Sequence, residues 1–204
     1  KKLIIGGAYL SNALQKSLIR AKINAYETYG MMETLSHIAV RKMTDPISEF
    51  KCLPGIFVGQ DNRKCLTINA PKLDIKNLIT NDQVELYSPT KFRLIGSIDH
   101  IIKLNGFNIH PEQVERKLSE KISSHFFVDK IVYKSKKEKL TIVIEDNSKV
   151  NFKKINDQIK SCKKLKKYEI PKCITLHKKF IQTYSGKIKR KETMNQNPFK
   201  VLDL

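Results

Sequence analysis

The sequence predicts an α/β part followed by an α+β part, and three observations lead to this fold class. Near the N-terminus, apolar runs flank a helical repeat, which is typical of a strand–helix–strand unit. Residues 57–95 are short strand-like runs separated by turn residues, as in a small antiparallel or barrel-like β-layer. After Gly96, strands and helices mix again. With 204 residues, the chain has room for two domains, which we expect at 1–97 and 98–204.

The first predicted unit is a strand, a helix and a second strand. The apolar run at residues 3–5 stops at two glycines, so we expect a buried strand to end there. Apolar residues at helical spacing predict a helix over 11–21, with Ser11 as its N-cap. A second strand is expected at 25–29, in register with the first.

The second part begins with a hairpin. Asn105-Gly106, a favoured dipeptide for two-residue turns, lies between two apolar runs. Pro111 then occupies the expected first position of a helix with an apolar stripe of Val114, Leu118 and Ile122. The remaining expected elements are strands at 126–133, 140–144 and 173–176 and a helix near 152–162. Together they predict a compact α+β unit.

The chain is strongly basic, with a formal net charge of +19. Of its 39 basic residues 33 are Lys and 6 are Arg, whereas base readout in nucleic acids favours Arg. The lysine-rich run 153–167 also lacks interleaved aromatic side chains for stacking on bases, so a nucleic-acid partner is not expected. Residues 1–97 carry a net charge of +6 and residues 98–204 carry +13. A polyanionic ligand would therefore be attracted towards the second half.

Other features favour a soluble cytoplasmic protein. No apolar run approaches the roughly 18–20 residues that span a bilayer, and no segment resembles a signal peptide. The cysteines are far apart in sequence and the histidines lack metal-ligand spacing, so we expect reduced, structural side chains rather than ligands. The structural residues are Cys52, Cys65, Cys162 and Cys173, and His100, His110, His125 and His177, while His37 is excepted.

Four motifs in fixed order carry the functional prediction. They are Tyr29-Gly30-Met31-Met32-Glu33-Thr34, Thr80-Asn81-Asp82, Asp99 to Gly106, and Ser185-Gly186-Lys187-Ile188. Together they resemble the last four signatures of the adenylate-forming acyl-CoA synthetases. Such enzymes activate a carboxylate with ATP, release pyrophosphate, and transfer the acyl group to coenzyme A. The resemblance covers nearly the whole chain and implies the end of a large N-terminal domain followed by a mobile α+β lid.

The resemblance implies a nucleotide site in the first part of the chain. Gly6, Gly7 and Ala8 match the segment that lines the adenine pocket, where glycine permits close backbone approach. Tyr29 and Gly30 match the residues at the adenine, with Tyr29 packing on the ring.

Three further roles in this part follow from the same resemblance. Glu33 matches the magnesium ligand, and Asp82 matches the acceptor of hydrogen bonds from the ribose hydroxyls. His37 follows the metal-binding motif closely and is a candidate for lining the acid pocket.

The resemblance also assigns roles in the second part. Asp99 matches the hinge about which the lid rotates, while Lys103 and Gly106 match the hairpin that faces the active site during thioester formation. Lys187 matches the catalytic lysine, whose ammonium bridges the carboxylate and the α-phosphate in the transition state. We interpret the next basic residues, Lys189 and Arg190, as solvated neighbours.

Three residues depart from the family pattern. Met32 stands where the family usually has a Thr that contacts the α-phosphate, and a thioether cannot donate that hydrogen bond. Asn81 replaces a glycine, and Ser97 replaces an arginine that directly follows the family's equivalent of Gly96. Arg93 lies four residues earlier, and whether it compensates is left open.

For the whole protein, we predict an acid–CoA ligase and keep other functions as alternatives. No Ser/Thr/Gly-rich phosphate loop is present, so we expect a C-terminal fragment that does not catalyse adenylation alone. The segments 25–30, 36–39, 69–73 and 80–82 resemble o-succinylbenzoate–CoA ligases of menaquinone biosynthesis. The alternatives are a ligase for another aryl or fatty acid, a carrier-loading adenylation domain, or a non-catalytic basic binding module. Oligomeric state, including a homo-oligomer, is left open.

Overall fold

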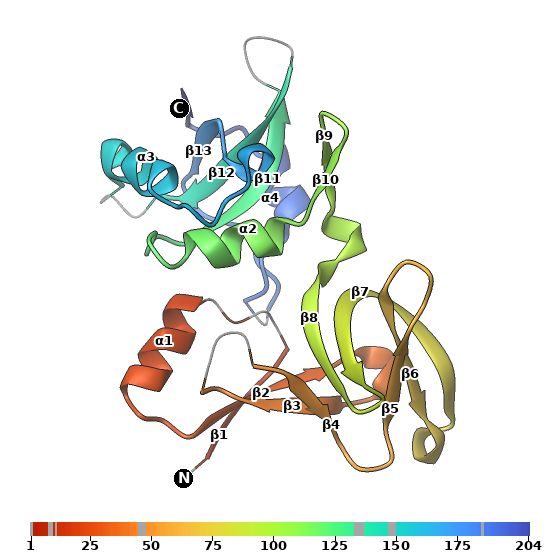
Figure 1. The fold of residues 1–204 in the computed structure, drawn as a ribbon. Coiled ribbons are helices and arrows are strands. Elements are labelled where there is room, and N and C mark those ends of the chain that lie inside the picture. The colour runs from red at the N-terminus through yellow and green to blue at the C-terminus, as the bar shows by residue number, and fades with distance from the viewer. Residues whose placement is uncertain are drawn as a thin grey trace. The chain divides into compact units, whose positions relative to one another are not determined.

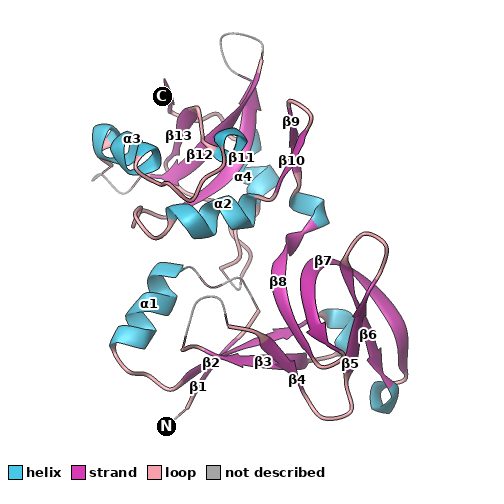
Figure 2. Cartoon of the chain, viewed as in Figure 1, coloured by secondary structure: helices cyan, strands magenta, loops and turns pink. Residues whose placement is uncertain are grey.

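The computed structural model describes residues 2–7, 10, 12–44, 48–132, 137–146, 150–184 and 186–204. The predicted N-cap Ser11 and the predicted adenine-pocket residue Ala8 lie outside the described residues. The chain divides into two compact units, Lys1–Asp99 and His100–Leu204 (Figure 1). Strands dominate both units, with few helices (Figure 2).

Unit 1 is built on one eight-stranded sheet in the order β1-β2-β3-β4-β8-β7-β6-β5. β1 and β2 are parallel, with Leu3 opposite Ala25, and every other neighbouring pair is antiparallel. Its elements are β1 (Leu3–Ile5), α1 (Asn12–Arg20), β2 (Ala25–Gly30), β3 (His37–Lys42), β4 (Phe50–Cys52), β5 (Phe57–Gln60), β6 (Cys65–Ala70), β7 (Ile75–Ser88) and β8 (Lys91–Ser97). Short 3-10 turns cover Met32–Thr34, Pro71–Leu73 and Ile98–His100.

The predicted strand–helix–strand unit and the predicted β-layer are both present in unit 1. β1, α1 and β2 form the first, and the parallel pairing of its strands gives the expected register. β5 to β8 form the antiparallel layer. β3 and β4 were not predicted, because their short sequences carry no clear alternation and gain their place by pairing between β2 and β8.

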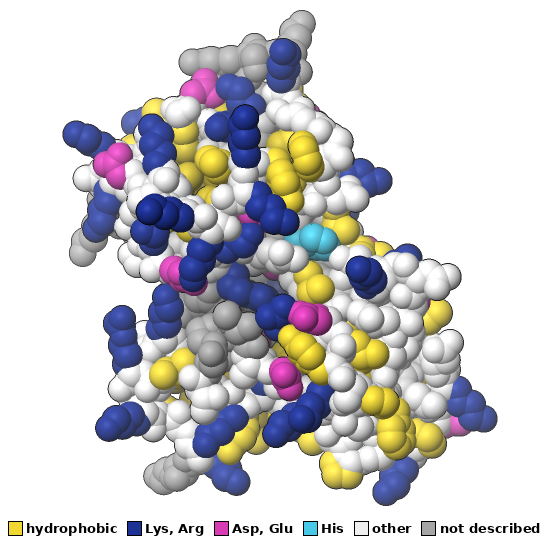
Figure 3. Space-filling view, viewed as in Figure 1, with side chains coloured by type: hydrophobic (Ala, Val, Ile, Leu, Met, Phe, Trp, Pro, Cys, Tyr) yellow, Lys and Arg dark blue, Asp and Glu magenta, His cyan; other side chains and the backbone are white. Residues whose placement is uncertain are grey.

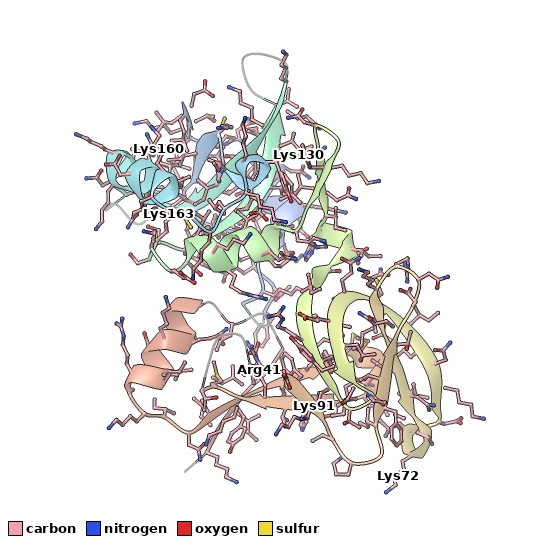
Figure 4. All side chains as sticks on the ribbon, viewed as in Figure 1. Arg41, Lys72, Lys91, Lys130, Lys160 and Lys163 are labelled. Carbon is pink, nitrogen blue, oxygen red and sulfur yellow. The ribbon has the colours of Figure 1, made fainter. Side chains whose placement is uncertain are left out.

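The core of unit 1 contains a stacked pair of phenylalanine rings. Phe50 and Phe92 stack with their centroids 5.5 Å apart, and both side chains are almost fully buried. A buried ion pair lies beside them, where Arg41 of β3 (Figure 4) donates through Nε to Glu27 of β2 at 2.6 Å. The guanidinium also lies over the Phe50 ring, 5.1 Å from its centroid. Since these two charges face each other across paired strands, burial does not leave either one uncompensated.

Unit 2 has a four-stranded sheet in the order β11-β12-β13-β14 and a separate hairpin of β9 and β10. β12 and β13 are parallel, and the other pairs are antiparallel. Its elements are β9 (Ile102–Leu104), β10 (Phe107–Ile109), α2 (Pro111–Leu118), β11 (Phe126–Val132), β12 (Glu138–Glu145), α3 (Phe152–Lys160), β13 (Cys173–His177), α4 (Arg190–Asn195) and β14 (Lys200–Asp203). A 3-10 turn covers Lys167–Glu169. This mixed architecture confirms the predicted α+β fold class.

The two faces of the unit 2 sheet are covered differently. The main core lies under α2 and α3 and includes the predicted apolar stripe of Val114, Leu118 and Ile122, all exposed by 2% or less. Helix α2 ends at Leu118, so Ile122 belongs to the following turn but still packs into the core. On the other face, Phe127 packs in a smaller cluster with Phe180, ahead of the unpredicted helix α4.

The surface is basic (Figure 3), and the cysteines are unpaired as expected. Lys and Arg side chains are spread over the visible surface of each unit, with hydrophobic side chains between them (Figure 3). All four cysteines are free thiols. In the part of the chain that the structure describes, no helix has the length and apolar character needed to cross a membrane.

Candidate functional site

The two glycines that follow β1 serve different purposes, since Gly6 lies close to β2 and Gly7 turns the chain. A Cβ added at Gly6 would lie 2.2 Å from Oγ1 of Thr28, and that hydroxyl donates to the carbonyl of Ile5 at 3.3 Å. Gly7 has a φ of +90°, which a residue with a side chain rarely adopts. Both predicted glycines are therefore required by local geometry, and both are exposed.

Tyr29 and Asp82 meet although they are 53 residues apart in the sequence. The hydroxyl of Tyr29 donates to Oδ2 of Asp82 at 2.7 Å. The ring of Tyr29 is only 8% exposed and packs edge-on against Phe50 and Phe92, with centroids 6.0 and 5.3 Å away. Burial, reinforced by the negative charge of Asp82, raises the pKa of Tyr29 far above its usual value. The phenol therefore stays protonated and acts as a permanent donor to this carboxylate.

The environment of Tyr29 bears on its predicted contact with adenine. Most of the ring is enclosed in the core, so only a small part of its surface is accessible to a ligand. Asp82, which accepts the hydrogen bond from Tyr29, is half-buried, and its backbone nitrogen donates to Oγ1 of Thr80 at 3.1 Å. The structure thus adds a function for Tyr29 that the sequence did not reveal, namely holding the carboxylate of Asp82 in place.

Gly30 marks a point where two backbone segments are too close for a side chain. A Cβ built at Gly30 would lie 2.4 Å from the carbonyl oxygen of Ser36 and 2.6 Å from Cα of His37. These are backbone atoms, which cannot swing away as a side chain can. Gly30 is therefore fixed by the turn that joins β2 to β3.

The same turn holds the predicted metal ligand at the surface. Thr34 is buried, and its hydroxyl accepts from the backbone nitrogen of Met31 at 3.0 Å and lies 2.7 Å from the carbonyl oxygen of Ser36. This network closes a short 3-10 turn whose other side chains, Met32 and Glu33, are exposed, with Met32 91% exposed. The turn therefore presents Met32 and Glu33 to solvent.

A magnesium site at Glu33 would need ligands from outside its immediate surroundings. Among the described residues, no group of three or more His, Cys, Asp or Glu side chains is placed to hold a metal ion. Mg²⁺ is usually bound by one or two carboxylates together with substrate phosphates and water, so a single exposed Glu33 fits that kind of site. His37 is also exposed, at the start of β3, and its Nδ1 lies 3.3 Å from Oγ of Ser36.

Two of the three departures from the family pattern contact each other and the predicted hinge residue. The side-chain nitrogen of Asn81 donates to the carboxylate of Asp99, at 3.2 and 3.1 Å from its two oxygens. Ser97 donates through Oγ to the carbonyl of Asn81 at 3.2 Å and accepts from the backbone nitrogen of Asp99 at 3.4 Å. Residue-by-residue comparison missed this cluster. The signal that could have found it is the pairing of β7 with β8, which sets Asp82 opposite Ser97.

The hairpin predicted around Asn105-Gly106 is present in unit 2. β9 and β10 pair with Lys103 opposite Asn108, and the turn residues Asn105 and Gly106 have φ of 49° and 81°. Two successive positive φ values are those of a type I′ turn, as the Asn-Gly dipeptide predicts. Lys103 is exposed on this hairpin.

A small pocket borders this hairpin. Phe107 of β10 stacks on Tyr168 with centroids 4.4 Å apart and planes 7° apart. The rings form part of the wall of a cavity of about 210 Å³. Its lining residues are Leu104, Asn105, Phe107, Glu138, Lys139, Leu140, Lys167, Tyr168, Ile170 and Lys172. The pocket thus combines aromatic surface with three lysines and one glutamate.

Lys187 lies at the tip of a second hairpin in unit 2. The backbone nitrogen of Lys189 donates to the carbonyl of Ile181 at 2.8 Å, and that of Thr183 donates to the carbonyl of Lys187 at 2.8 Å. Gly186, with a φ of +82°, turns the chain at the tip. Ser185 lies outside the described residues, and Lys187 is exposed. We name residues 181–189 the lysine hairpin.

The expectation that Arg190 is a solvated neighbour of Lys187 is wrong. Its two terminal nitrogens donate to the two carboxylate oxygens of Glu115 in α2, at 2.6 and 2.9 Å. The side chain of Arg190 is 19% exposed and that of Glu115 is 10% exposed. Lys189 does behave as expected, since it is exposed and pairs with Glu192 of the helix α4 that follows it. Sequence spacing could not separate the two residues because the partner of Arg190 is 75 positions away.

Comparison with known proteins identifies the fold. No protein-family model matches the chain, and a search of curated proteins finds no match. Among solved structures, o-succinylbenzoate CoA synthetase from Bacillus subtilis, in complex with its acyl-adenylate intermediate, matches 98% of this chain with 18% identity and a TM-score of 0.78. An anthranilate CoA ligase in complex with anthranoyl-AMP matches 95% with 16% identity and a TM-score of 0.75.

A third solved structure gives the same result. Coronafacic acid ligase from Pectobacterium brasiliense matches 98% of this chain with 19% identity and a TM-score of 0.71. The chain covers 47%, 44% and 45% of the lengths of these three structures, so it spans less than half of each. The resemblance seen in the four motifs is thus confirmed at the level of the fold: this chain has the fold found in adenylate-forming acyl-CoA synthetases.

Proposed function

We propose that this chain is part of an ATP-dependent acid–CoA ligase, which adenylates a carboxylic acid and then forms a thioester with coenzyme A. The observation that carries the proposal is the contact between Tyr29 and Asp82, at 2.7 Å. Two motifs that the sequence linked to one nucleotide site meet at one point of unit 1. The shared fold with adenylate-forming ligases supports the same interpretation.

In the proposed nucleotide site, each residue has a role that its surroundings support. The half-buried carboxylate of Asp82, held by Tyr29, would accept hydrogen bonds from the two ribose hydroxyls. The exposed glycines Gly6 and Gly7 would let the backbone approach the adenine closely. Glu33 would hold Mg²⁺ together with the phosphates, and the ion would neutralise phosphate charge. A solved structure of the Bacillus subtilis o-succinylbenzoate CoA synthetase contains ATP and a magnesium ion.

In the proposed first reaction, a carboxylate oxygen attacks the α-phosphorus of ATP. The bond from that phosphorus to the bridging oxygen breaks, and pyrophosphate leaves. Lys187 would stabilise the charge that develops between the two anions, and one such contact can contribute about 3 kcal/mol to lowering the barrier. Its exposed position on the lysine hairpin suits a group that must reach a ligand.

In the proposed second reaction, the thiol of coenzyme A attacks the acyl carbonyl. The C–O bond of the mixed anhydride breaks and AMP leaves. The hairpin that carries Lys103 and Gly106 would face the reacting groups in this step. The pocket beside it has three lysines, Lys139, Lys167 and Lys172, which would attract the phosphates of coenzyme A.

The proposed acid is o-succinylbenzoate, which would place the enzyme in menaquinone biosynthesis. Four segments of the sequence support this substrate, and His37, exposed next to Gly30, would line its pocket. The names of the other two matched enzymes refer to different acids, so anthranilate and coronafacate serve as comparison substrates. A cytoplasmic location fits the four free thiols.

The test is ATP–pyrophosphate exchange by the complete natural protein with o-succinylbenzoate, anthranilate, coronafacate or a medium-chain fatty acid. We expect exchange with o-succinylbenzoate and a loss of a hundredfold or more in Lys187→Ala. Exchange with another acid alone would keep the reaction and replace the substrate. Transfer of the acyl group to a carrier protein instead of coenzyme A would indicate a carrier-loading enzyme. No exchange with any acid would contradict the proposal and favour a non-catalytic basic module.

A further inference from the structure

The ion pair of Arg190 and Glu115 connects three elements of unit 2. Arg190 is the first residue of α4, directly after the lysine hairpin, while Glu115 belongs to α2. Both side chains also bind the backbone of Val128 in β11: Glu115 accepts from its nitrogen at 2.8 Å, and Arg190 lies 3.4 Å from its carbonyl oxygen. The guanidinium lies over the ring of Phe127 in the same strand, 5.4 Å from its centroid.

This geometry requires an arginine. The two nitrogens of the planar guanidinium meet both oxygens of one carboxylate, a bidentate arrangement that a lysine ammonium cannot reproduce. Breaking such a pair on one side would leave the partner charge largely buried without compensation. Arg190 is therefore fixed far more firmly than its exposed neighbour Lys189.

The lysine hairpin is attached to the rest of unit 2 at both of its ends. At its start, the backbone nitrogen of Phe180 donates to Glu145 at 2.8 Å, and that of Ile181 donates to the buried hydroxyl of Thr193 at 3.0 Å. At its end, the fixed point is Arg190. Between these points, the tip carries the exposed Lys187. The placement of Lys187 therefore depends on the attachments at both ends of the hairpin. The attachment at Arg190 is only three residues from Lys187.

We infer that Arg190 and Glu115 are positioning residues for Lys187, which they place by fixing the C-terminal end of the lysine hairpin. This inference rests on the proposed function in one respect: it assigns the effect to the adenylation step, in which Lys187 acts. Thioester formation from an acyl-adenylate that is already made would not need the same placement. The pair therefore acts on one half of the reaction.

The experiment compares Arg190→Lys and Glu115→Gln with Lys189→Ala, the matched control at the neighbouring exposed lysine. In the complete natural protein, acid-dependent ATP–pyrophosphate exchange reports adenylation. Release of AMP from a supplied acyl-adenylate, on addition of coenzyme A, reports thioester formation. We expect both variants to lose at least tenfold in the kcat of adenylation, with the KM for ATP and thioester formation changed by less than about threefold. The control should keep both activities.

A second measurement, hydrogen–deuterium exchange, tests the inference without an enzyme assay. Hydrogen–deuterium exchange should rise at least tenfold in peptides covering residues 181–189 of both variants and stay unchanged in peptides covering β12 and β13. Equal losses in both half-reactions, or faster exchange throughout unit 2, would show a merely structural pair and overturn the inference. Unchanged exchange in the hairpin would also overturn it. If the parent protein adenylates no acid, the proposed function fails, whereas the exchange experiment still decides whether the pair holds the hairpin.

Discussion

The side-chain nitrogen of Asn81 lies 3.2 and 3.1 Å from the two carboxylate oxygens of Asp99, so one amide holds the last residue of unit 1. The contact is exposed, and hydrogen bonds to charged groups are worth about 1.5–3 kcal/mol when well formed. For this exposed contact, we expect Asn81→Ala to lower the free energy of unfolding by about 1 kcal/mol. Urea denaturation measures this change.

A second variant at the same position gives the contact a pH signature. Asn81→Asp would place two carboxylates together, and like charges at that distance repel and raise one of the two pKa values. We expect this variant to be less stable than Asn81→Ala at pH 7 and equal to it below about pH 3, where both carboxyls are protonated. Equal stability of the two variants at pH 7 would contradict a direct contact with Asp99.

The hydrogen bond from Tyr29 to Asp82 predicts a loss of stability in Tyr29→Phe and, with the proposed function, a loss of ATP binding. The variant keeps the ring in the core but removes the donor to a half-buried carboxylate. We expect a destabilisation of about 1.5–3 kcal/mol and a severalfold higher KM for ATP in exchange assays. Tyr184→Phe is the control for stability, because that side chain is fully exposed, and it should unfold as the parent does. A Tyr29→Phe protein of parental stability would show that the bond contributes nothing.

The close approach at Gly30 predicts that Gly30→Ala is one of the most damaging small substitutions in the chain. The added Cβ would lie 2.4 Å from a backbone oxygen, so the turn between β2 and β3 must move. We expect a destabilisation of more than about 3 kcal/mol, in the range of strained backbone sites. Gly106→Ala separates this clash from strain alone: its Cβ meets nothing within 4 Å, but its φ is +81°. That control should cost only about 1–2 kcal/mol, and an equal cost at both sites would remove the argument from contact.

The buried imidazole of His177 predicts an acid-side loss of stability. Its side chain is 2% exposed, and among the described residues neither ring nitrogen has a hydrogen-bond partner. Burial lowers the pKa of His177 below its usual value near 6.5. Because the unfolded chain binds the proton more readily, stability is complete above about pH 6.5 and falls as the pH drops towards the lower folded pKa.

The charged neighbours of His177 allow its contribution to be isolated. Glu145, its register partner on β12, binds His125 at 2.8 Å, and Lys200 pairs with the residue before His177. Burial raises the pKa of Glu145, but its hydrogen bonds with His125 and with the backbone nitrogen of Phe180 hold that pKa below its usual value. The stability that Glu145 contributes is therefore lost only at more acidic pH. Thermal unfolding of His177→Leu should lack the loss of stability that begins below about pH 6.5. An unchanged profile would exclude His177 as its source.

The local elements could be read from the sequence, because each is specified by residues next to one another. The Asn105-Gly106 turn and the Pro111 helix start follow from backbone preferences and are present as expected. The strands β3 and β4 were missed because their place depends on pairing with distant strands rather than on their own pattern. The division into nucleotide and lid domains, and the roles of the site residues, remain predictions.

The long-range polar contacts could not be predicted from spacing. The interpretation of Arg190 as solvated failed because a basic residue next to Lys187 carries no local sign of a partner in α2. Asn81 and Ser97, taken singly, were departures from a pattern, whereas the structure shows that each contacts Asp99. Such pairs are specified by the fold, so they become visible only when the strands and helices are in place.

The contacts of Glu115 and Arg190 with Val128 also have a consequence for how this protein behaves towards other copies of itself. β11 is an outer strand of the four-stranded sheet, and the outward N–H and C=O groups of such a strand can recruit a strand from another chain. At Val128, Glu115 binds the N–H, and Arg190 lies within hydrogen-bonding distance of the C=O. The middle of this outer strand is therefore closed to intermolecular β-pairing at Val128.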